Sequence, residues 1–146
     1  DIEHCVIVGG TTAVGTAVES WLETSGYRVS GVADNALNVD SRLAGANRYE
    51  TALLAGQLAT RLGAFDSSEV FFATGDNWPD ALALAPMAGE ERHVLVLIAG
   101  DEIGRSTAVA NHLVSRQSAP PECTFIGGSA AISDYVRGQV RTALGF

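Results

Sequence analysis

The chain has 146 residues, of which 47% are apolar and 18% charged, and its formal net charge is −8. This length is typical of one ordinary domain, and the apolar content is sufficient for a sizeable core. All nine basic residues are arginine, so Schiff-base enzymes, lysine general bases and phosphate loops that need a lysine are excluded. The excess of acidic residues argues against a nucleic-acid partner. No apolar run approaches the ~20 residues that span a bilayer, which argues against membrane insertion.

The same sequence pattern opens and closes the chain. Residues 5–14 (CVIVGGTTAV) recur as residues 123–132 (CTFIGGSAAI). In each copy an apolar run ends in two glycines, and a segment with helical spacing follows and stops at a glycine. The pattern predicts a strand, a tight turn, a helix and a glycine C-cap. We therefore expect the tail of a preceding repeat in residues 1–41 and one complete repeat in residues 42–146, as in a slice of a tandem array.

Strand and helix patterns alternate between the two copies. The predicted strands are 28–32, 69–74 and 93–98, the predicted helices 49–62 and 109–113, and the irregular connection 34–41. Alternation with fully apolar strands predicts an α/β fold, in which a mostly parallel sheet is flanked by helices on both faces as a Rossmann-like three-layer module. Because the chain reaches its first predicted strand almost at once, we expect a piece of a longer protein whose export signal lies outside it.

The turn at Gly9 and Gly10 has two interpretations. Backbone amides at a helix N-terminus can bind phosphate. However, the third glycine of a dinucleotide fingerprint is missing, and Thr16 follows Gly15 where a phosphate loop needs lysine. We favour a tight turn that lets the helix pack closely on its strand.

Two arginines mark the segment RLAGANRYETA, residues 42–52. Asn47 and Glu50 have the spacing of a capping box, which predicts a structural role for Glu50. Neither helix capping nor an apolar stripe explains Arg42 and Arg48. They either pair with acids of the same chain or present their guanidinium groups to a carboxylate or phosphate ligand.

A second informative segment is ATGDNWPDALA, residues 73–83. Asp76 or Asn77 is expected to cap a helix, with Pro79 in its first turn and Asp80 near the positive end of its dipole. These roles account for both carboxylates, so we do not expect them to be catalytic. Trp78, at the junction of loop and helix, is either a core residue or a stacking platform for a sugar ring.

Candidate catalytic and metal-binding groups are scattered. His4, His93 and His112 match no ligand spacing, and no nucleophile motif is present, so we predict no catalytic residue, no metal and no cofactor. Cys5 and Cys123 occupy equivalent positions of the repeat. Two interpretations stay open for them, buried thiols or a single disulfide.

Four segments together resemble the cell wall-binding repeat type 2 family. They are residues 42–52, residues 73–83, the apolar strand 94–98 and IGGSAAIS at residues 126–133. The family is known from Gram-positive surface proteins, including S-layer proteins and autolysins. There, three tandem copies fold as Toprim-like α/β modules around a pseudo-threefold axis and anchor an effector domain to an anionic cell-wall polymer. One departure is His93, which stands where the family usually has a proline.

The resemblance implies a noncatalytic, extracellular anchoring module at the cell wall or cell surface. Its ligand would be an anionic cell-wall polymer or a peptidoglycan-associated glycan, and it would self-associate with other copies of the repeat as a dimer or trimer. The residues implied in polymer binding, with two neighbours from the second segment, are Arg42, Arg48, Tyr49, Thr51, Asp76, Asn77, Trp78 and Asp80. The alternatives are a structural or oligomerisation spacer and, less favoured, an α/β enzyme that binds a nucleotide or phosphate.

Overall fold

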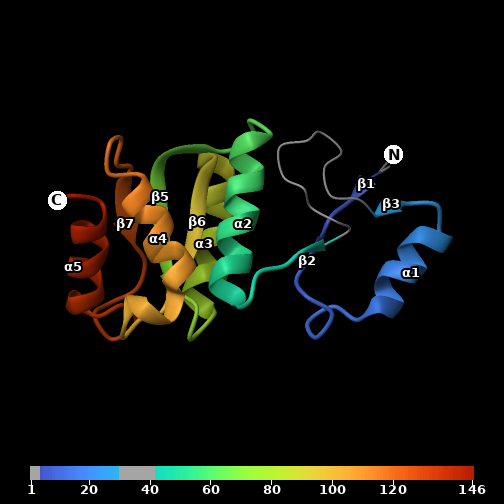
Figure 1. Cartoon of the computed structure of the whole chain (residues 1–146), viewed down its shortest axis with the longest axis horizontal. Coiled ribbons are helices and arrows are strands. Elements are labelled where there is room, and N and C mark those ends of the chain that lie inside the picture. Colours follow the sequence, from blue (N-terminus) through green and yellow to red (C-terminus); the bar gives the residue numbers. More distant parts are fainter. Residues whose placement is uncertain (1–3, 30–41) are drawn as a thin grey trace.

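The computed structural model describes residues 4–29 and 42–146, and these residues form two lobes (Figure 1). The N-terminal lobe comprises residues 4–29 together with 42–43. The main body comprises residues 48–146, and residues 44–47 connect the two. The predicted irregular connection 34–41 lies outside the described residues.

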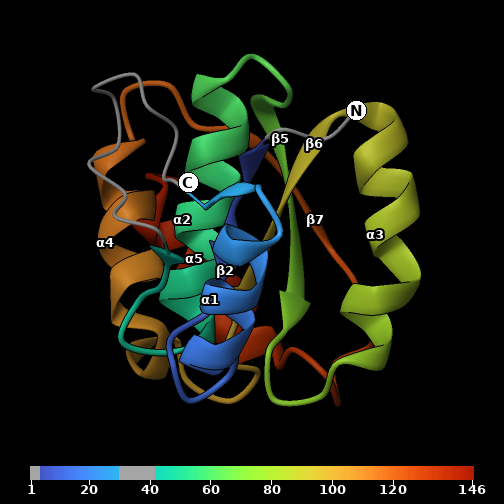
Figure 2. The same cartoon turned by 90° about the vertical axis from the view of Figure 1, so that its right-hand side faces the viewer.

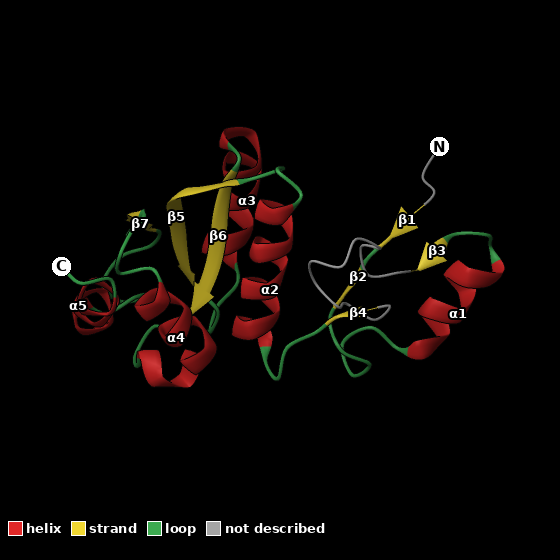
Figure 3. Cartoon of the chain, turned by 45° about the horizontal axis from the view of Figure 1, so that its top comes forward, coloured by secondary structure: helices red, strands yellow, loops and turns green. Residues whose placement is uncertain are grey.

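The N-terminal lobe consists of short strands and one helix. Its elements are β1 (His4–Cys5), β2 (Ile7–Val8), α1 (Thr16–Thr24), β3 (Arg28–Val29) and β4 (Arg42–Leu43). β1 pairs with β3 and β2 pairs with β4, both in parallel (Figure 3). This is the strand, turn and helix that the first copy of the repeated sequence predicts.

A three-stranded parallel sheet forms the centre of the main body. Its strands are β5 (Asp66–Thr74), β6 (His93–Ile98) and β7 (Glu122–Phe125), in the order β6-β5-β7. Phe72 in the middle of β5 lies opposite Val96 of β6 and Phe125 of β7. The central strand β5 is buried on both faces, as its continuous apolar run predicts.

Helices cover both faces of this sheet (Figure 2). The main body contains α2 (Arg48–Arg61), α3 (Pro79–Glu91), the short 3-10 helix η1 (Ile103–Ser106), α4 (Thr107–Ser115) and α5 (Asp134–Ala143). α3 packs alone on one face against β5 and β6, and α2, α4 and α5 pack side by side on the other. The predicted α/β class with three layers is confirmed.

The sheet separates two apolar clusters. The larger one lies beneath α2, α4 and α5 and includes Phe72, Ile98 and Val109, none of which has measurable exposure. The smaller one joins Phe71 to Leu84 beneath α3. Burying one such side chain stabilises the fold by about 1.5–3 kcal/mol, so the larger cluster dominates the stability of the main body.

The two predicted helix starts differ in outcome. Asn47 caps α2 by accepting hydrogen bonds of 3.0 Å from the N–H groups of Tyr49 and Glu50, as predicted. The Glu50 carboxylate reaches back to the N–H of Ala46, one residue before the cap. At α3 the prediction of an Asp76 or Asn77 cap was wrong. The N-cap residue is Trp78, which makes no capping bond through its side chain, and Pro79 begins the helix.

The two copies of the repeated sequence have the same backbone form. Gly9 and Gly127, the first glycine of each pair, have φ angles of 124° and 94°, which disfavour any residue with a Cβ atom. Cys5 and Cys123 lie in different sheets and both are free thiols. The division of the chain at residue 42 into two repeats stays a prediction.

Candidate functional site

The carboxyl ends of the main-body strands surround an open polar depression of about 630 Å³. β5 leads into α3 on one face of the sheet, whereas its neighbours β6 and β7 lead into α4 and α5 on the other face. Adjacent strands whose helices leave on opposite faces create a crevice, and this is where open α/β sheets bind ligands. The depression is therefore our candidate site.

Asp76, in the loop after β5, is the centre of the site's hydrogen-bond network. Its carboxylate accepts bonds from the Gly100 N–H at 3.0 Å and from the Tyr49 hydroxyl at 2.8 Å. It also forms an ion pair with Arg105 at 2.9 Å. Partial burial acts to raise the pKa of Asp76, but these three donors outweigh it and hold the pKa below its usual value.

Tyr49 and Arg48 approach the depression from the first turn of α2. The Tyr49 ring is buried beside Gly75, and its hydroxyl donates to Asp76. Burial, and then the neighbouring Asp76, raise the pKa of Tyr49, so the phenol stays protonated and donates. Arg48 is exposed at the edge and donates one hydrogen bond of 2.8 Å to the Gly75 carbonyl.

Arg105 joins two strand ends across the site. It donates to Asp101, which follows β6, at 2.6 Å and pairs with Asp76, which follows β5. The hydrogen bond from Arg105 lowers the pKa of Asp101. The cation therefore neutralises two carboxylates that would otherwise repel each other.

Asp80 and Asn77 complete the polar lining from the side of α3. Neither side chain has a hydrogen bond or ion pair within the described ranges 4–29 and 42–146. The Asp80 carboxylate lies against the turn after β7, so close to Gly127 that a Cβ atom there would be 2.5 Å from Oδ2. Asp80 is thus a carboxylate with spare acceptor capacity on a rigid helix.

Gly100 brings the ends of β6 and β7 together. A Cβ atom at this position would lie 2.1 Å from the Ala131 carbonyl oxygen, so only glycine permits the observed approach. The Gly100 carbonyl accepts a bond from the N–H of Ser133, and its N–H donates to Asp76. The turn after β7 is held over the site by this contact.

Three of the predicted residues lie away from the depression. Trp78 has 70% of its surface exposed, but it lines a neighbouring apolar groove beside Leu82 of α3. Thr51 bonds to the backbone of Asn47 and Gly45 at the start of α2. The third, Arg42, belongs to the N-terminal lobe.

Arg42 is fully engaged within that lobe. Its guanidinium pairs with Glu19 at 3.0 Å and donates to the carbonyl oxygens of Gly9, Val14 and Gly15. Four hydrogen bonds and the ion pair thus engage all three nitrogens of the guanidinium, and only 11% of the side chain is exposed. Arg42 and Arg48, close in sequence, therefore bind to turns of different lobes.

The sequence analysis missed Arg105, Asp101 and Gly100. A signal for them was present, because Gly100 and Asp101 directly follow an apolar strand, as Gly75 and Asp76 do. Carboxyl ends of adjacent parallel strands meet at one edge of a sheet. A prediction from this signal would have required knowing that β5 and β6 are neighbours in the sheet. Within the described part of the chain, no group of three or more histidine, cysteine, aspartate or glutamate residues is placed to hold a metal ion.

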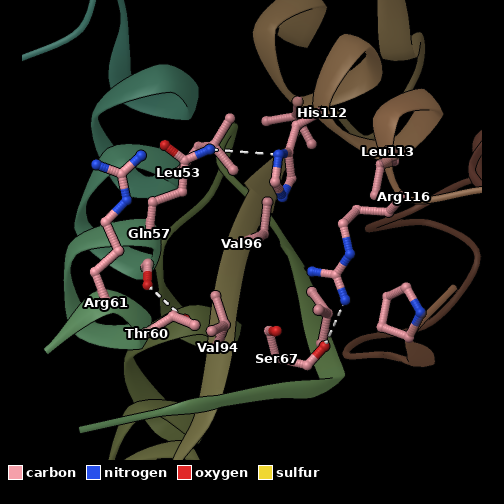
Figure 4. A pocket seen from close by; sticks show the side chains of 14 residues that line it. Leu53, Gln57, Thr60, Arg61, Ser67, Val94, Val96, His112, Leu113 and Arg116 are labelled. Atoms are coloured by element: carbon pink, nitrogen blue, oxygen red, sulfur yellow. Dashed lines mark hydrogen bonds between the residues drawn. The ribbon is translucent and has the colours of Figure 1, made fainter. Parts of the chain in front are cut away.

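A second hollow, of about 230 Å³, lies between α2 and α4 (Figure 4). Its walls are mainly apolar, with Leu53 and Val96 among them, and Gln57 and His112 face each other across it at 3.3 Å. Burial, and to a lesser degree Arg116, lowers the pKa of His112, so this ring is neutral at pH 7. None of the eight residues implied in polymer binding lines this hollow.

Comparisons with known proteins give one family and two similar bacterial proteins. The family model described as cell wall binding domain 2 (CWB2) matches residues 42–137. N-acetylmuramoyl-L-alanine amidase LytC of Bacillus subtilis (strain 168) is 27% identical over 140 residues, which are 96% of this chain and 24% of that protein. The amidase enhancer of the same bacterium is 26% identical over 139 residues, 95% of this chain and 16% of that protein.

The fold has a counterpart among solved structures. Cwp8 from Clostridium difficile matches with a TM-score of 0.65 at 18% sequence identity, over 97% of this chain and 20% of that one. At this identity the match shows a shared fold. The chain spans a quarter or less of the length of all three proteins, so what those proteins do as wholes extends beyond the part that is similar.

Proposed function

The chain belongs to the cell wall binding domain 2 family, and we propose that it is a noncatalytic anchoring module that holds an attached protein on a cell-wall glycan. Its place is the cell wall or surface of a Gram-positive bacterium. In the described ranges, no helix is both long and apolar enough to cross a membrane. The observation that carries the proposal is the polar depression at the carboxyl edge of the sheet, into which Asp80 and Asn77 project unengaged.

Sugar hydroxyls match the chemistry of this depression. A carboxylate accepts up to four hydrogen bonds and a side-chain amide both donates and accepts, which suits the paired hydroxyls of a glycan. Asp80 and Asn77 have this capacity unused, and Asp76 is held in place behind them by Arg105 and Tyr49. Trp78, which follows Asn77 in sequence and lines the neighbouring apolar groove, adds an exposed indole ring on which a sugar ring can stack.

The charge balance bears on which cell-wall ligand fits. Asp76, Asp80 and Asp101 line the depression together with Arg105, which is already committed to two of these carboxylates. A polyanion would meet an excess of negative charge. Of the two ligands that the sequence left open, we therefore favour hydroxyl-rich glycan over an anionic polymer held by clustered arginines.

Co-sedimentation with purified Gram-positive cell walls tests the site. Asp80→Asn and Trp78→Ala should each weaken binding about tenfold, since each removes one to two hydrogen bonds or one stacking contact. Glu90→Gln, on the exposed far end of the same helix, and Trp21→Ala, the other exposed tryptophan, are the matched controls. Unchanged binding by both site variants would refute the assignment.

The wall preparation separates the two ligands. Acid extraction removes the secondary polymer and leaves peptidoglycan. Equal binding before and after extraction, with less than about a twofold change between low and physiological salt, supports recognition of glycan hydroxyls. Loss of binding after extraction, together with steep salt dependence, would identify the anionic polymer as the ligand.

One observation favours a second candidate function, a structural or oligomerisation spacer. The helix α1 of the N-terminal lobe has no buried residue and exposes Val18 and Trp21. An apolar helix face of this kind is typical of a contact surface. Glycan binding and assembly use different lobes in these two proposals, so one protein can do both.

A further inference from the structure

The hollow between α2 and α4 has apolar walls and room for a small molecule. Six aliphatic side chains from the two helices and the sheet line it, and none of them is more than 7% exposed: Leu53, Val70, Val94, Val96, Val109 and Leu113. Its volume is about 230 Å³. An apolar cavity of about 150 Å³ already binds benzene. The hollow can therefore hold an apolar group of the size of one ring together with a small polar substituent.

Polar contacts bridge the space between the two helices. On the side of α2, a Cβ atom on Gly56 would lie 2.5 Å from Val94, so the helix approaches β6 as closely as glycine allows. On the side of α4, Gln57 contacts His112 at 3.3 Å, and Arg116 donates to a main-chain carbonyl at the start of β5 at 3.2 Å. Protein cores leave few voids of this size. The helices are thus joined across the hollow, but their side chains do not fill it.

His112 presents an unused hydrogen-bond donor to the hollow. Its ring is neutral, and the amide nitrogen of Gln57 can only donate, so Nδ1 of the ring accepts and the proton is on Nε2. Nε2 has no hydrogen-bond partner within the described ranges 4–29 and 42–146. Figure 4 shows the ring directed between the helices towards Val96. An N–H group without an acceptor in apolar surroundings favours a ligand that supplies one.

Two arginines that line the hollow have no acidic partner in the described part of the chain. Arg61, in the last turn of α2, is exposed and makes no hydrogen bond or ion pair there. Arg116 donates only to main-chain carbonyls, through Nη2, which leaves its Nε and Nη1 unused. Among these residues, no aspartate or glutamate lines the hollow. In a chain of net charge −8, the hollow therefore carries a local excess of positive charge.

We propose that this hollow is a binding site for a small apolar carboxylate. The apolar part of the ligand would pack against Leu53 and Val96. Its carboxylate would accept hydrogen bonds from Nε2 of His112 and from Arg116, which lies one turn further along α4, with Arg61 as a second positive charge at the rim. An inorganic anion would leave the aliphatic walls without a partner, and a neutral hydrocarbon would leave the N–H groups without an acceptor.

The site is separate from the depression at the carboxyl edge of the sheet. The two share no lining residue, so the inference is independent of glycan binding. The same ligand chemistry occurs in a free acid and at the C-terminus of a peptide with small apolar side chains. The experiment below distinguishes these two sources.

Titration of the whole chain with sodium benzoate at pH 7, followed by NMR, tests the proposal. Benzoate should cause saturable shifts of the amide resonances of residues 53–61 and 107–116, with a Kd of about 1 mM or tighter. It should also shift the imidazole Nε2 resonance of His112. Benzamide, which has the same ring but no charge, should bind at least about tenfold more weakly. N-acetyl-dialanine is the second probe: if it binds more tightly than benzoate, the ligand is a peptide C-terminus, and if benzoate binds more tightly, the ligand is a free acid.

Substitution of the arginines separates a carboxylate site from a merely apolar hollow. Arg116→Gln should weaken benzoate binding about tenfold and Arg61→Gln about threefold, and neither should change the weak binding of benzamide. Glutamine keeps an N–H donor at position 116, and no contact of the described fold depends on Arg61. Arg141→Gln is the matched control, because Arg141 is also an exposed arginine in the last turn of a helix but does not line the hollow.

Three results would overturn the proposal. One is the absence of saturable shifts in residues 53–61 and 107–116 with up to about 20 mM of either carboxylate probe. Another is a Kd for benzamide equal to that for benzoate, because the charge would then play no part. The third is an unchanged Kd for benzoate in both Arg116→Gln and Arg61→Gln while their melting temperatures match that of the unsubstituted chain.

Discussion

Replacing Arg42 with alanine tests whether this residue, the first of the segment 42–52, has a structural or a ligand-binding role. The guanidinium makes one ion pair with Glu19 and contacts three carbonyl oxygens in the turn of the N-terminal lobe. The two charged side chains are only 11% and 17% exposed, so water replaces little of what is lost. Removing one partner of a largely buried pair costs about 3–5 kcal/mol, and each orphaned carbonyl adds to this.

We take about 3 kcal/mol as the expected loss, at the low end because the lobe can relax. Each 1.4 kcal/mol changes an equilibrium tenfold, so opening of the lobe should become about a hundredfold more frequent. Hydrogen exchange of residues 4–29 measures this opening, with residues 48–146 as reference. Arg28→Ala is the matched control, because the exposed side chain of Arg28, in the same lobe, makes no hydrogen bond or ion pair with the other described residues.

The second copy of the repeat suggests a compensating substitution for the loss of Arg42. Arg137 stands in α5 at the position that Glu19 has in α1, and it donates to the carbonyls of Ile132 and Gly127, the equivalents of Val14 and Gly9. Glu19→Arg combined with Arg42→Ala should therefore restore much of the protection. If Arg42→Ala instead weakened wall binding while the exchange of residues 4–29 stayed unchanged, the structural role would be refuted.

Four further substitutions test the main body. Asp76→Asn should cost about 1–2 kcal/mol at pH 7, a value reduced because 36% of the side chain is exposed. Folding lowers the pKa of Asp76, so the ionised carboxylate contributes fully to the free energy of unfolding above about pH 4, and this contribution is lost as the pH falls further. The free energy of unfolding of the variant should therefore depend less steeply on pH in acid. Gly100→Ala should lower stability by about 3 kcal/mol through its clash with the turn after β7, whereas Gly89→Ala, in open space on α3, should raise it by about 0.5–1 kcal/mol. Arg137→Lys should cost about 1–2 kcal/mol in thermal unfolding, because lysine loses the two-carbonyl bridge and the contact with the Phe125 ring.

Local rules of sequence predicted the elements whose determinants are themselves local. Asn47 and Glu50 predict the start of α2, because a capping residue and its partner lie within one turn of helix. The apolar run of β5 and the glycine turns at positions 9 and 127 were predictable for the same reason. The sequence predicted Asp76 or Asn77 as the cap of α3, but the helix begins later, after Trp78, and Asp76 accepts instead from donors on other elements.

The candidate site depends on contacts between elements that are distant in sequence. Asp76 meets Gly100 and Arg105 only because β5 and β6 are neighbours in the sheet. No short-range pattern encodes this adjacency. Arg42 and Arg48 show the converse, since both come from one short segment and were both implied in polymer binding, but β4 and α2 carry them to separate lobes.

The role of arginine explains why the number of basic residues is a poor guide to the ligand. At least five of the nine arginines donate to main-chain carbonyl oxygens at turns or strand ends: Arg42, Arg48, Arg92, Arg116 and Arg137. A planar guanidinium can bridge two carbonyls in a fixed geometry, which the single ammonium of lysine cannot do. A chain that fastens its loops in this way needs arginine rather than lysine, whatever it binds. The guanidinium groups engaged there are unavailable to a polyanion, so the unengaged acceptors at the carboxyl edge of the sheet are the better guide to the ligand.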